Sequence, residues 1–273
     1  MLWRVIISNN NNAAENMAID ESIFNAVRNK EVNPTIRFYN WLKPTVSIGY
    51  NQNANQEIDF KLLEKFGYDF VRRPTGGRMV LHDSEITYSV ISPARGRLSG
   101  SIQTTYKEIS SALMEGLSAL GIKVNAEKGS LSSNSQRKLK NPCFSSASRF
   151  ELTYNHKKIV GSAQVRKDNC LLQHGSILLH KNQKHIVNII PALNPKQRQR
   201  LKLILSKKTI AINQILETPV KFKDAVKILV DSFQKKWNDE KFVLNNDLSI
   251  NEIKKAKNLI SSKYKSYEWN MRK

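Results

Sequence analysis

The first part of the chain alternates short apolar runs with stretches of helical periodicity. The apolar runs, bounded by Gly, Pro, Asn or Asp, predict strands over residues 3–7, 35–41, 45–50, 69–72 and 86–92. Residues 14–30 predict a helix, and Asp59 can cap a shorter helix that ends just before Gly67. Small and apolar residues at i, i+3, i+4, i+7, i+8 and i+11 from Ile109 predict an amphipathic helix that Gly121 ends.

The second part begins with a polar stretch over residues 127–141, which predicts a mobile surface loop. Strands are predicted over residues 149–154, 158–165 and 170–179, the first two joined by a turn at Asn155 and His156. Beyond Lys181 the pattern becomes helical, with an apolar stripe over residues 222–237 and a capping box at Ser249 and Glu252. We therefore expect a mixed α+β catalytic body over residues 1–185. A basic, mainly helical C-terminal region over residues 186–273 then packs on this body or extends it.

Composition indicates an ordinary globular protein, with 40% hydrophobic and 25% charged residues. No apolar run approaches the roughly 20 residues that span a bilayer, and the N-terminal apolar stretch is too short for a secretory signal. We therefore expect a cytoplasmic protein. Two cysteines, Cys143 and Cys170, are too few for a disulfide scaffold and match neither zinc spacing nor a CxxC pair.

The net charge of +21 adds a possible function to this picture, because the electrostatic field of so basic a protein attracts polyanions at long range. From Lys181 onward there are 21 basic and 8 acidic residues, so the charge is concentrated in the last third. Nucleic acid and acidic carrier domains are both possible partners, and a lysine-rich composition with solvated side chains is the simpler alternative.

Three segments could carry chemistry. The first is RRPTGGRMVLHD, residues 72–83, in which paired glycines let backbone N–H groups approach an anion or a developing oxyanion. The same pattern is typical of a simple tight turn, and it matches neither a Walker A loop nor GxGxxG. The candidate ligand-binding residues here are Arg72, Arg73, Thr75, Gly76, Gly77, Arg78 and His82.

The second segment is Asn141-Pro142-Cys143-Phe144-Ser145. Polar neighbours place Cys143 near solvent, as a nucleophile requires, whereas Cys170 lies in an apolar strand and is interpreted as structural. The third segment, KKIVGSAQ, has a lysine pair followed by Gly161, Ser162 and Ala163, which are unusually small for a strand. They leave room for a ligand such as an acyl chain to lie against the backbone.

Together these segments resemble those of the biotin and lipoate protein ligases and the octanoyltransferases. RRPTGGRMVLHD and KIVGSAQ carry the resemblance to the whole family, while PCFSSASRFEL and LLQHGSILL resemble its octanoyltransferase branch. The resemblance covers roughly residues 16–179 and implies a mixed-sheet catalytic domain of the biotin/lipoate protein ligase type.

The resemblance also implies roles for individual residues. Lys158, rather than Lys157, matches the active-site lysine, and Cys143 matches the nucleophile that carries an acyl thioester. An ammonium beside the thiol would lower its pKa from about 8.5 toward neutrality. The arginine and glycine segment with Gly161, Ser162 and Ala163 would line the acyl pocket or stabilise the oxyanion.

The implied reaction moves octanoate from octanoyl-acyl carrier protein to a lysine of a lipoyl domain, such as the glycine cleavage H protein, in lipoate biosynthesis. It requires no cofactor and no metal, and we expect a monomer that binds neither membrane nor nucleic acid. Two alternatives stay open. One is an ATP-dependent lipoate-protein ligase on the same fold, and the other is a non-enzymatic basic binding module.

Overall fold

The structure is a computed structural model that describes residues 1–127, 151–244 and 247–272. Its strands are β1 (Leu2–Asn11), β2 (Thr35–Trp41), β3 (Thr45–Ile48), β4 (Asp69–Arg72), β5 (Val80–His82), β6 (Glu85–Pro93), β7 (Asn125–Glu127), β8 (Glu151–Tyr154), β9 (Lys157–Lys167), β10 (Cys170–Leu178) and β11 (Lys241–Leu244). Its α-helices are α1 (Ala13–Arg28), α2 (Ala54–Glu57), α3 (Phe60–Lys65), α4 (Ile102–Ala119), α5 (Pro195–Lys208), α6 (Phe222–Lys236), α7 (Ile250–Leu259) and α8 (Tyr267–Asn270). Shorter turns of helix are η1 (Gly96–Leu98), η4 (Gln183–Ile189), η5 (Ile212–Gln214) and η6 (Ile260–Tyr264).

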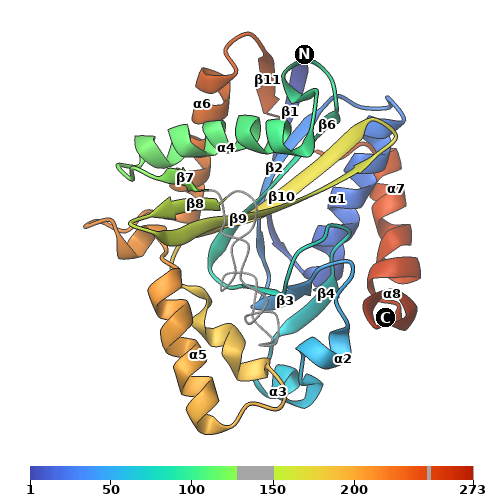
Figure 1. The fold of residues 1–273 in the computed structure, drawn as a ribbon. Helices are drawn as coiled ribbons and strands as arrows, with labels where there is room; N and C mark the ends of the chain where they lie inside the picture. The colour runs from blue at the N-terminus through green and yellow to red at the C-terminus, as the bar shows by residue number, and fades with distance from the viewer. Residues whose placement is uncertain (128–150, 245–246, 273) are drawn as a thin grey trace.

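The strands form one large and one small mixed sheet (Figure 1). The large sheet has the order β11-β1-β2-β6-β10-β9-β8-β7, in which β1 pairs in parallel with β2 and β11 and the remaining neighbours are antiparallel. The small sheet has the order β4-β3-β5, with β3 parallel to β4 and antiparallel to β5. Helices segregated on the faces of mixed sheets make this an α+β fold.

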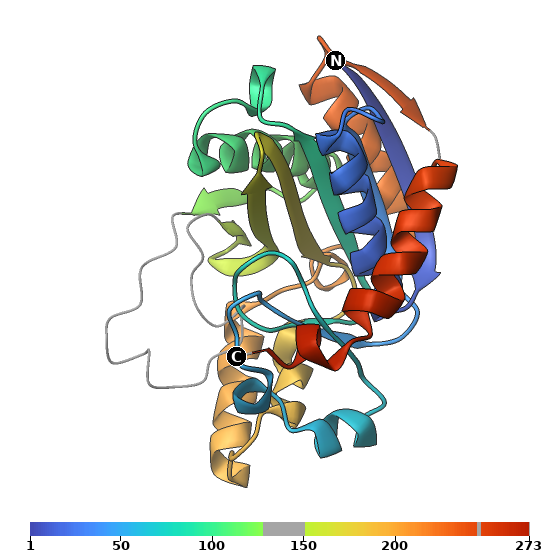
Figure 2. The ribbon, with the colours of Figure 1, turned by 90° about the vertical axis from the view of Figure 1, so that its right-hand side faces the viewer.

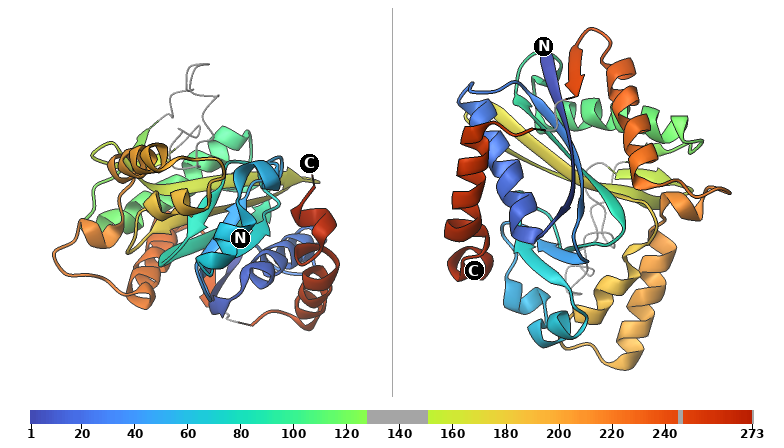
Figure 3. Two further views of the ribbon diagram at one scale, coloured as in Figure 1. Left: turned by 90° about the horizontal axis from the view of Figure 1, so that it is seen from below. Right: turned by 180° about the vertical axis from the view of Figure 1, so that it is seen from behind.

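Two groups of helices cover the large sheet. Helices α4 and α6 pack on one face, where Leu113, Leu229 and Phe233 join a core that reaches Phe38 and Tyr88 of the sheet. Helix α1 covers the other face, and α7 lies along the outer side of α1 (Figures 2 and 3). Each helix thus buries its apolar stripe, which contributes about 25 cal/mol for each Å² of apolar surface removed from water.

The small sheet has its own core beneath α3, η4 and α5. Val46 and Ile48 of β3 contact a cluster that includes Leu63 of α3, Ile186 of η4 and Leu205 of α5. This second core holds the turn between β4 and β5 against β10 of the large sheet, because Leu178 belongs to the same cluster. The site described below lies where the two sheets meet.

Most predicted elements are confirmed. Asp59 caps α3 through the N–H groups of Lys61 and Leu62, and the capping box of Ser249 and Glu252 begins α7. Gly67 and Gly121 follow their helices with positive φ, as the sequence predicts. The turn before β9 has positive φ at both Asn155 and His156, which gives the hairpin its two-residue connection. The predictions for the polar loop and for Cys143 lie outside the described residues.

The region beyond Lys181 also contains a short strand that the sequence pattern did not predict. The short strand β11 adds to the edge of the large sheet, pairing Lys241–Leu244 with residues 2–5. Four residues between helices leave too little alternation for a pattern to predict a strand, and the pairing depends on a partner at the other end of the chain. Strands β5 and β7, of three residues each, are also absent from the prediction for the same reason. The boundary between body and C-terminal region at residue 185 stays a prediction.

Ion pairs and hydrogen bonds fasten the C-terminal region to the body. Arg4 of β1 donates two hydrogen bonds, of 3.1 and 2.6 Å, to the buried Glu252 carboxylate of α7. The guanidinium of Arg72 donates to the carbonyl oxygens of Trp269, Asn270 and Arg272 at 2.8–3.0 Å. It also donates to the carbonyls of residues 49, 50 and 52. Among the described residues, no helix is both long and apolar enough to cross a membrane.

We expect Arg72→Ala to destabilise the protein by about 3 kcal/mol or more, because it leaves six carbonyl oxygens without a shared buried donor. Urea unfolding measures the loss, and limited proteolysis should show cleavage after α7 first. The exposed Arg95→Ala is the control and should change stability by about 0.5 kcal/mol at most. Equal effects of the two substitutions would show that Arg72 does not anchor the C-terminus.

Candidate active site

A cavity of about 80 Å³ lies between the two sheets. Tyr39, Trp41 and Met17 give it apolar walls, and Val80 contributes from β5. Of the residues predicted from the sequence, it is lined by Arg73, Gly77, His82, Gly161, Ser162 and Ala163. The structure therefore brings the arginine and glycine segment and the small run of β9 to one place, although some 80 residues separate them in the chain.

The turn between β4 and β5 is shaped by close backbone approach. A Cβ atom on Gly49 would lie 2.0 Å from the carbonyl oxygen of Gly77, and Gly77 itself has φ of +97°. Arg73 closes the turn from inside, because its guanidinium donates to the carbonyls of Gly76 and Arg78, each at 2.8 Å. Glycine is thus required at Gly49 and Gly77, whereas a Cβ atom on Gly76 would meet open space, and Arg73 holds the conformation of the turn.

The floor of the cavity is equally tight. A Cβ atom on Gly175 of β10 would meet the carbonyl oxygen of Gly161 and the ring of Tyr88, each at 2.6 Å. Ser162 and Tyr88 share a hydrogen bond of 2.7 Å between their hydroxyl oxygens. Burial raises the pKa of Tyr88 to about 12, so the phenol stays neutral. Gly175 therefore lets β10 pack closely against Gly161 and Tyr88, and Gly161, Ser162 and Ala163 of β9 line the cavity beside it.

A first hydroxyl–imidazole–carboxylate chain borders the cavity through His82. Its Nε2 lies 2.7 Å from Ser47 Oγ, and its Nδ1 lies 2.7 Å from Glu85 Oε1. The Glu85 carboxylate also accepts hydrogen bonds from Thr87 and Ser176. The ring of Trp41 stacks on the imidazole, with centroids 4.3 Å apart. The imidazole orientation is thus fixed by one stacked face and by a partner at each ring nitrogen.

A second chain of the same type runs through His174 of β10. Thr75 Oγ1 lies 2.6 Å from His174 Nε2, and His174 Nδ1 lies 3.4 Å from Asp20 Oδ2. Burial lowers the pKa of His174, while Asp20 opposes this, and the net direction is downward. A neutral imidazole here donates from Nδ1 to Asp20 and accepts the Thr75 hydroxyl proton at Nε2.

Asp20 is itself fully buried and joins four elements. It accepts hydrogen bonds from Arg37 at 2.8 Å, Tyr39 at 2.9 Å and Ser89 at 3.1 Å. Burial alone would raise the pKa of this carboxyl. The Arg37 guanidinium and His174 lower it by more, so the net pKa lies below the usual value. The carboxylate is therefore charged and compensated at neutral pH.

Lys158 lies on β9, three residues before Gly161. Its side chain is only 3% exposed, and its Nζ lies 2.7 Å from Glu151 Oε1 at the start of β8. A buried ammonium needs such a partner, because an unpaired buried charge costs several kcal/mol. Lys158 does not line the cavity of the described residues, although its strand does.

Not every predicted residue lies at the cavity. Arg72 is turned away from it and binds the C-terminal carbonyls described above, while Thr75 acts through His174. Cys143 lies outside the described residues. Sequence reasoning missed Ser47, Glu85, Asp20, His174 and Glu151. A histidine within the apolar run LLQHGSILL is the one local signal that pointed to a buried polar partner.

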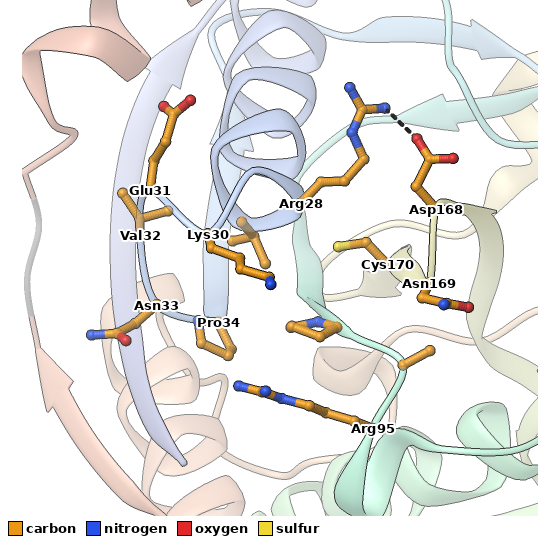
Figure 4. Close-up of a pocket in the computed structure, with 13 residues that line it drawn as sticks. Arg28, Lys30, Glu31, Val32, Asn33, Pro34, Arg95, Asp168, Asn169 and Cys170 are labelled. Atoms are coloured by element: carbon orange, nitrogen blue, oxygen red, sulfur yellow. Dashed lines mark ion pairs between the residues drawn. The ribbon is translucent and has the colours of Figure 1, made fainter.

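A larger cavity of about 710 Å³ lies elsewhere, between the end of α1, the start of β2 and the β9–β10 turn (Figure 4). Arg28 forms a 3.6 Å ion pair with Asp168 at its rim. Cys170 is buried beside it, donating to the Ser92 carbonyl, and burial raises the pKa of its thiol to about 11. This cavity shares no lining residue with the candidate active site in the described part of the chain.

The comparison with known families agrees with this geometry. The model of the lipoyl protein ligase A/B catalytic domain matches residues 12–234. The chain belongs to this family. The ligase A/B match spans the strands and turns that form the cavity, as well as α5 and most of α6. The predicted resemblance is therefore confirmed at the level of the family.

Within the ligase A/B family, relatives of almost the same length are octanoyltransferases. The chain is 37% identical to octanoyltransferase LipM of Anoxybacillus flavithermus, over 100% of this chain and 99% of that relative. It is 36% identical to octanoyltransferase LipM of Bacillus subtilis, over 99% of this chain and 98% of the relative.

Solved structures of ligases share the fold. A bi-partite lipoate protein ligase from Thermoplasma acidophilum superposes with a TM-score of 0.79 at 22% identity, covering 99% of this chain and 96% of the other. A lipoate-protein ligase A bound with ATP gives a TM-score of 0.79 at 23% identity, with 99% of each chain covered. The predicted α+β ligase-type fold with C-terminal helices is confirmed.

We expect Asp20→Asn to destabilise the protein by about 3 kcal/mol at pH 7, because Arg37 then keeps a buried, uncompensated charge. The folded-state pKa of Asp20 is lowered, so its stabilising contribution is complete above about pH 4 and disappears as the pH falls through the folded pKa. The stability difference between wild type and variant should therefore shrink as the pH falls below about 4. Urea unfolding across this range measures it, and a constant difference would contradict the assigned charge.

Proposed function

We propose that this protein transfers an octanoyl group from octanoyl-acyl carrier protein, through a thioester on Cys143, to a lysine of a lipoyl domain. The glycine cleavage H protein is the acceptor that we propose, and the enzyme acts as a cytoplasmic monomer. The observation that carries the octanoyl assignment is the similarity of 35–37% over nearly the whole length to relatives named octanoyltransferase. The geometry adds a narrow apolar cavity beside a strand that bears a buried lysine.

The proposed reaction has two acyl transfers. The Cys143 thiolate attacks the donor thioester carbonyl, and the carrier thiolate leaves and takes up a proton. The neutral amine of the acceptor lysine then attacks the enzyme thioester, forms the amide and releases the Cys143 thiolate. The first step exchanges one thioester for another and the second forms a more stable amide, so ATP is not required.

The cavity suits the acyl chain of such a substrate. Tyr39, Trp41 and Met17 offer apolar contacts, and the small residues Gly161, Ala163 and Gly175 line the same cavity. The backbone N–H groups of the Gly76–Gly77 turn are the proposed donors to the developing oxyanion. Because burial lowers its pKa, His174 adds polarity to the cavity without adding charge.

Glu151 enters this proposal as a positioning residue. Its carboxylate, 2.7 Å from Lys158 Nζ, holds the ammonium in one place at the base of the β8–β9 hairpin. A fixed ammonium can favour the Cys143 thiolate and later hold or release a proton during transfer. The carboxylate also limits how strongly Lys158 can lower the thiol pKa, because the two charges act in opposite directions.

Incubation with octanoyl-acyl carrier protein in the absence of ATP tests the function. Intact mass should show one octanoyl adduct on the wild type and on Cys170→Ala, and none on Cys143→Ala. Cys170 is an apt control because its buried thiol, with a pKa of about 11, is protonated at pH 8. Transfer from free octanoate or lipoate only when ATP is added would replace this proposal with the ligase alternative.

The Lys158–Glu151 pair predicts opposite changes in Cys143 reactivity. Lys158→Met removes the positive charge, so the pH midpoint of iodoacetamide alkylation should rise toward or above about 8.5, and transfer should fall about 100-fold or more. Glu151→Gln removes the negative charge, so the midpoint should fall. Lys157→Met is the matched control and should leave the midpoint unchanged, because neighbouring strand residues point to opposite faces. Unchanged midpoints in both variants would show that Lys158 and Glu151 do not affect the pKa of the Cys143 thiol.

A further inference from the structure

The segment around α5 has an unusual charge distribution. Between Asp168 and Glu217 the chain has eight lysine and arginine residues and no acidic residue. The 23 acidic residues of the chain, spread evenly, would place about four in a stretch of this length. The cations of this stretch therefore have no acidic neighbour within the stretch itself, although Asp83 from outside it pairs with Lys181 at 3.0 Å.

This positive region is fastened to both sides of the candidate active site. The amide of Ile210, just after α5, donates to the carbonyl oxygen of Lys158 at 3.1 Å. Thr209 forms an isolated parallel β-bridge with Lys158. On the other side, the Gln183 side chain of η4 binds the amide and carbonyl of Leu81 at 3.0 and 2.6 Å. Leu81 precedes His82, so the region borders both strands that carry predicted site residues.

The outer face of α5 presents a stripe of four side chains, which we call the α5 stripe: Lys196, Arg200, Leu203 and Lys207. Their spacing of i, i+4, i+7 and i+11 keeps them within an arc of about 60° on one face of the helix. All four are exposed, and Leu203 retains 54% of its accessible surface. None of the three cations forms an ion pair with an acidic residue in the described parts of the chain.

Other cations of the same segment lie around His185. Lys181, Lys184 and Lys202 surround His185, whose pKa is lowered first by burial and then by these charges, with Asp83 opposing them. The α5 stripe therefore combines a long-range attraction for negative charge with one exposed apolar side chain at its centre. An apolar side chain surrounded by charged ones is typical of a protein interface. The phosphate backbone of a nucleic acid offers no apolar group to contact Leu203, so this surface favours a protein partner.

We propose that the α5 stripe docks the acidic carrier protein that delivers the acyl thioester. This inference rests on the proposed function and names the surface that its donor uses. The stripe runs away from Lys158, and at a rise of about 1.5 Å per residue Lys196 lies about 20 Å along the helix from Thr209. A carrier presents its thioester on a long, flexible phosphopantetheine arm that can span this separation.

The acceptor fits this surface less well. A lysine side chain has five bonds of about 1.5 Å from Cα to Nζ, so the acceptor domain must sit directly at the mouth of the site. The donor and acceptor can therefore use different surfaces, the donor along α5 and the acceptor next to the hairpin. This separation allows the acyl-enzyme to form before the acceptor arrives.

The test compares two donors and two charge-reversal variants. The first variant is Lys196→Glu/Arg200→Glu/Lys207→Glu on α5, and the second is Lys254→Glu/Lys257→Glu/Lys265→Glu, also exposed, on and after α7. Helices α5 and α7 lie on opposite sides of the molecule (Figures 1 and 3). Both variants change the net charge equally, so they separate a local surface from overall charge.

With octanoyl-acyl carrier protein as donor, the α5 variant should raise KM about tenfold or more, while the α7 variant should leave it within about twofold. With octanoyl-pantetheine, which lacks the protein body, neither variant should change kcat/KM. Leu203→Ser should raise only the carrier KM, and Lys196→Arg/Lys207→Arg should keep it, because the charge is retained. Raising the salt concentration should weaken carrier use by wild type, since the Debye length is already about 8 Å at 0.15 M.

Other outcomes overturn the inference. Equal rises in both charge-reversal variants would assign the effect to net charge, and a rise confined to the acceptor KM would assign the stripe to the lipoyl domain. Loss of octanoyl-pantetheine turnover in the α5 variant would place the stripe in the chemical step. If wild type transfers octanoate from neither donor, the proposed function itself fails, which is a distinct result.

Discussion

The buried ion pair between Arg37 and Asp20 is the interaction on which the site most depends. Arg37 of β2 is fully buried, donates to Asp20 at 2.8 Å and to Asn16 of α1 at 2.7 Å, and lies over the ring of Tyr39. Asp20 also accepts a hydrogen bond from His174, and the other nitrogen of this imidazole hydrogen-bonds to Thr75 in the glycine turn. One carboxylate thus fixes α1, β2, β10 and the turn between β4 and β5 relative to one another. Because removing either charge leaves the other buried and unpaired, the arrangement has little freedom to relax.

The two imidazole chains show how polarity is placed in a cavity that must stay apolar enough for an acyl chain. In each chain a hydroxyl group faces one ring nitrogen and a carboxylate faces the other, through Glu85 for His82 and through Asp20 for His174. The carboxylates lie behind the rings, where Thr87, Ser89 and Ser176 also donate to them. Neither carboxylate residue lines the cavity, whereas both histidines and the hydroxyl residues Ser47, Thr87 and Ser176 do, so neutral polar groups separate the carboxylates from it.

Local sequence patterns predicted the fold well, but could not resolve which side chains meet. Asp59, Gly67, Gly121 and the Asn155–His156 turn act through residues two to four positions away, so their roles can be inferred from spacing. Arg72 and Arg73 are adjacent and chemically identical, yet one binds the C-terminus and the other shapes the glycine turn. That difference depends on partners about 200 residues away, which no local pattern contains. Likewise His82 was found through its motif, whereas Asp20 and Ser47 gave no signal because each is ordinary in its own helix or strand.

Much of the net charge of +21 lies on the surface, because buried cations need compensating groups. Three of them pair with a carboxylate, Arg4 with Glu252, Arg37 with Asp20 and Lys158 with Glu151, and Arg72 is compensated by backbone carbonyl oxygens. An unpaired buried ion costs several kcal/mol, whereas an exposed ion pair contributes at most about 1 kcal/mol. Folding therefore constrains the buried charges strongly and the exposed ones hardly at all. The excess cations can therefore lie on the surface at little cost in stability. In the segment without acidic residues beside Lys158, they can attract an acidic partner without disturbing the buried groups that hold the site together.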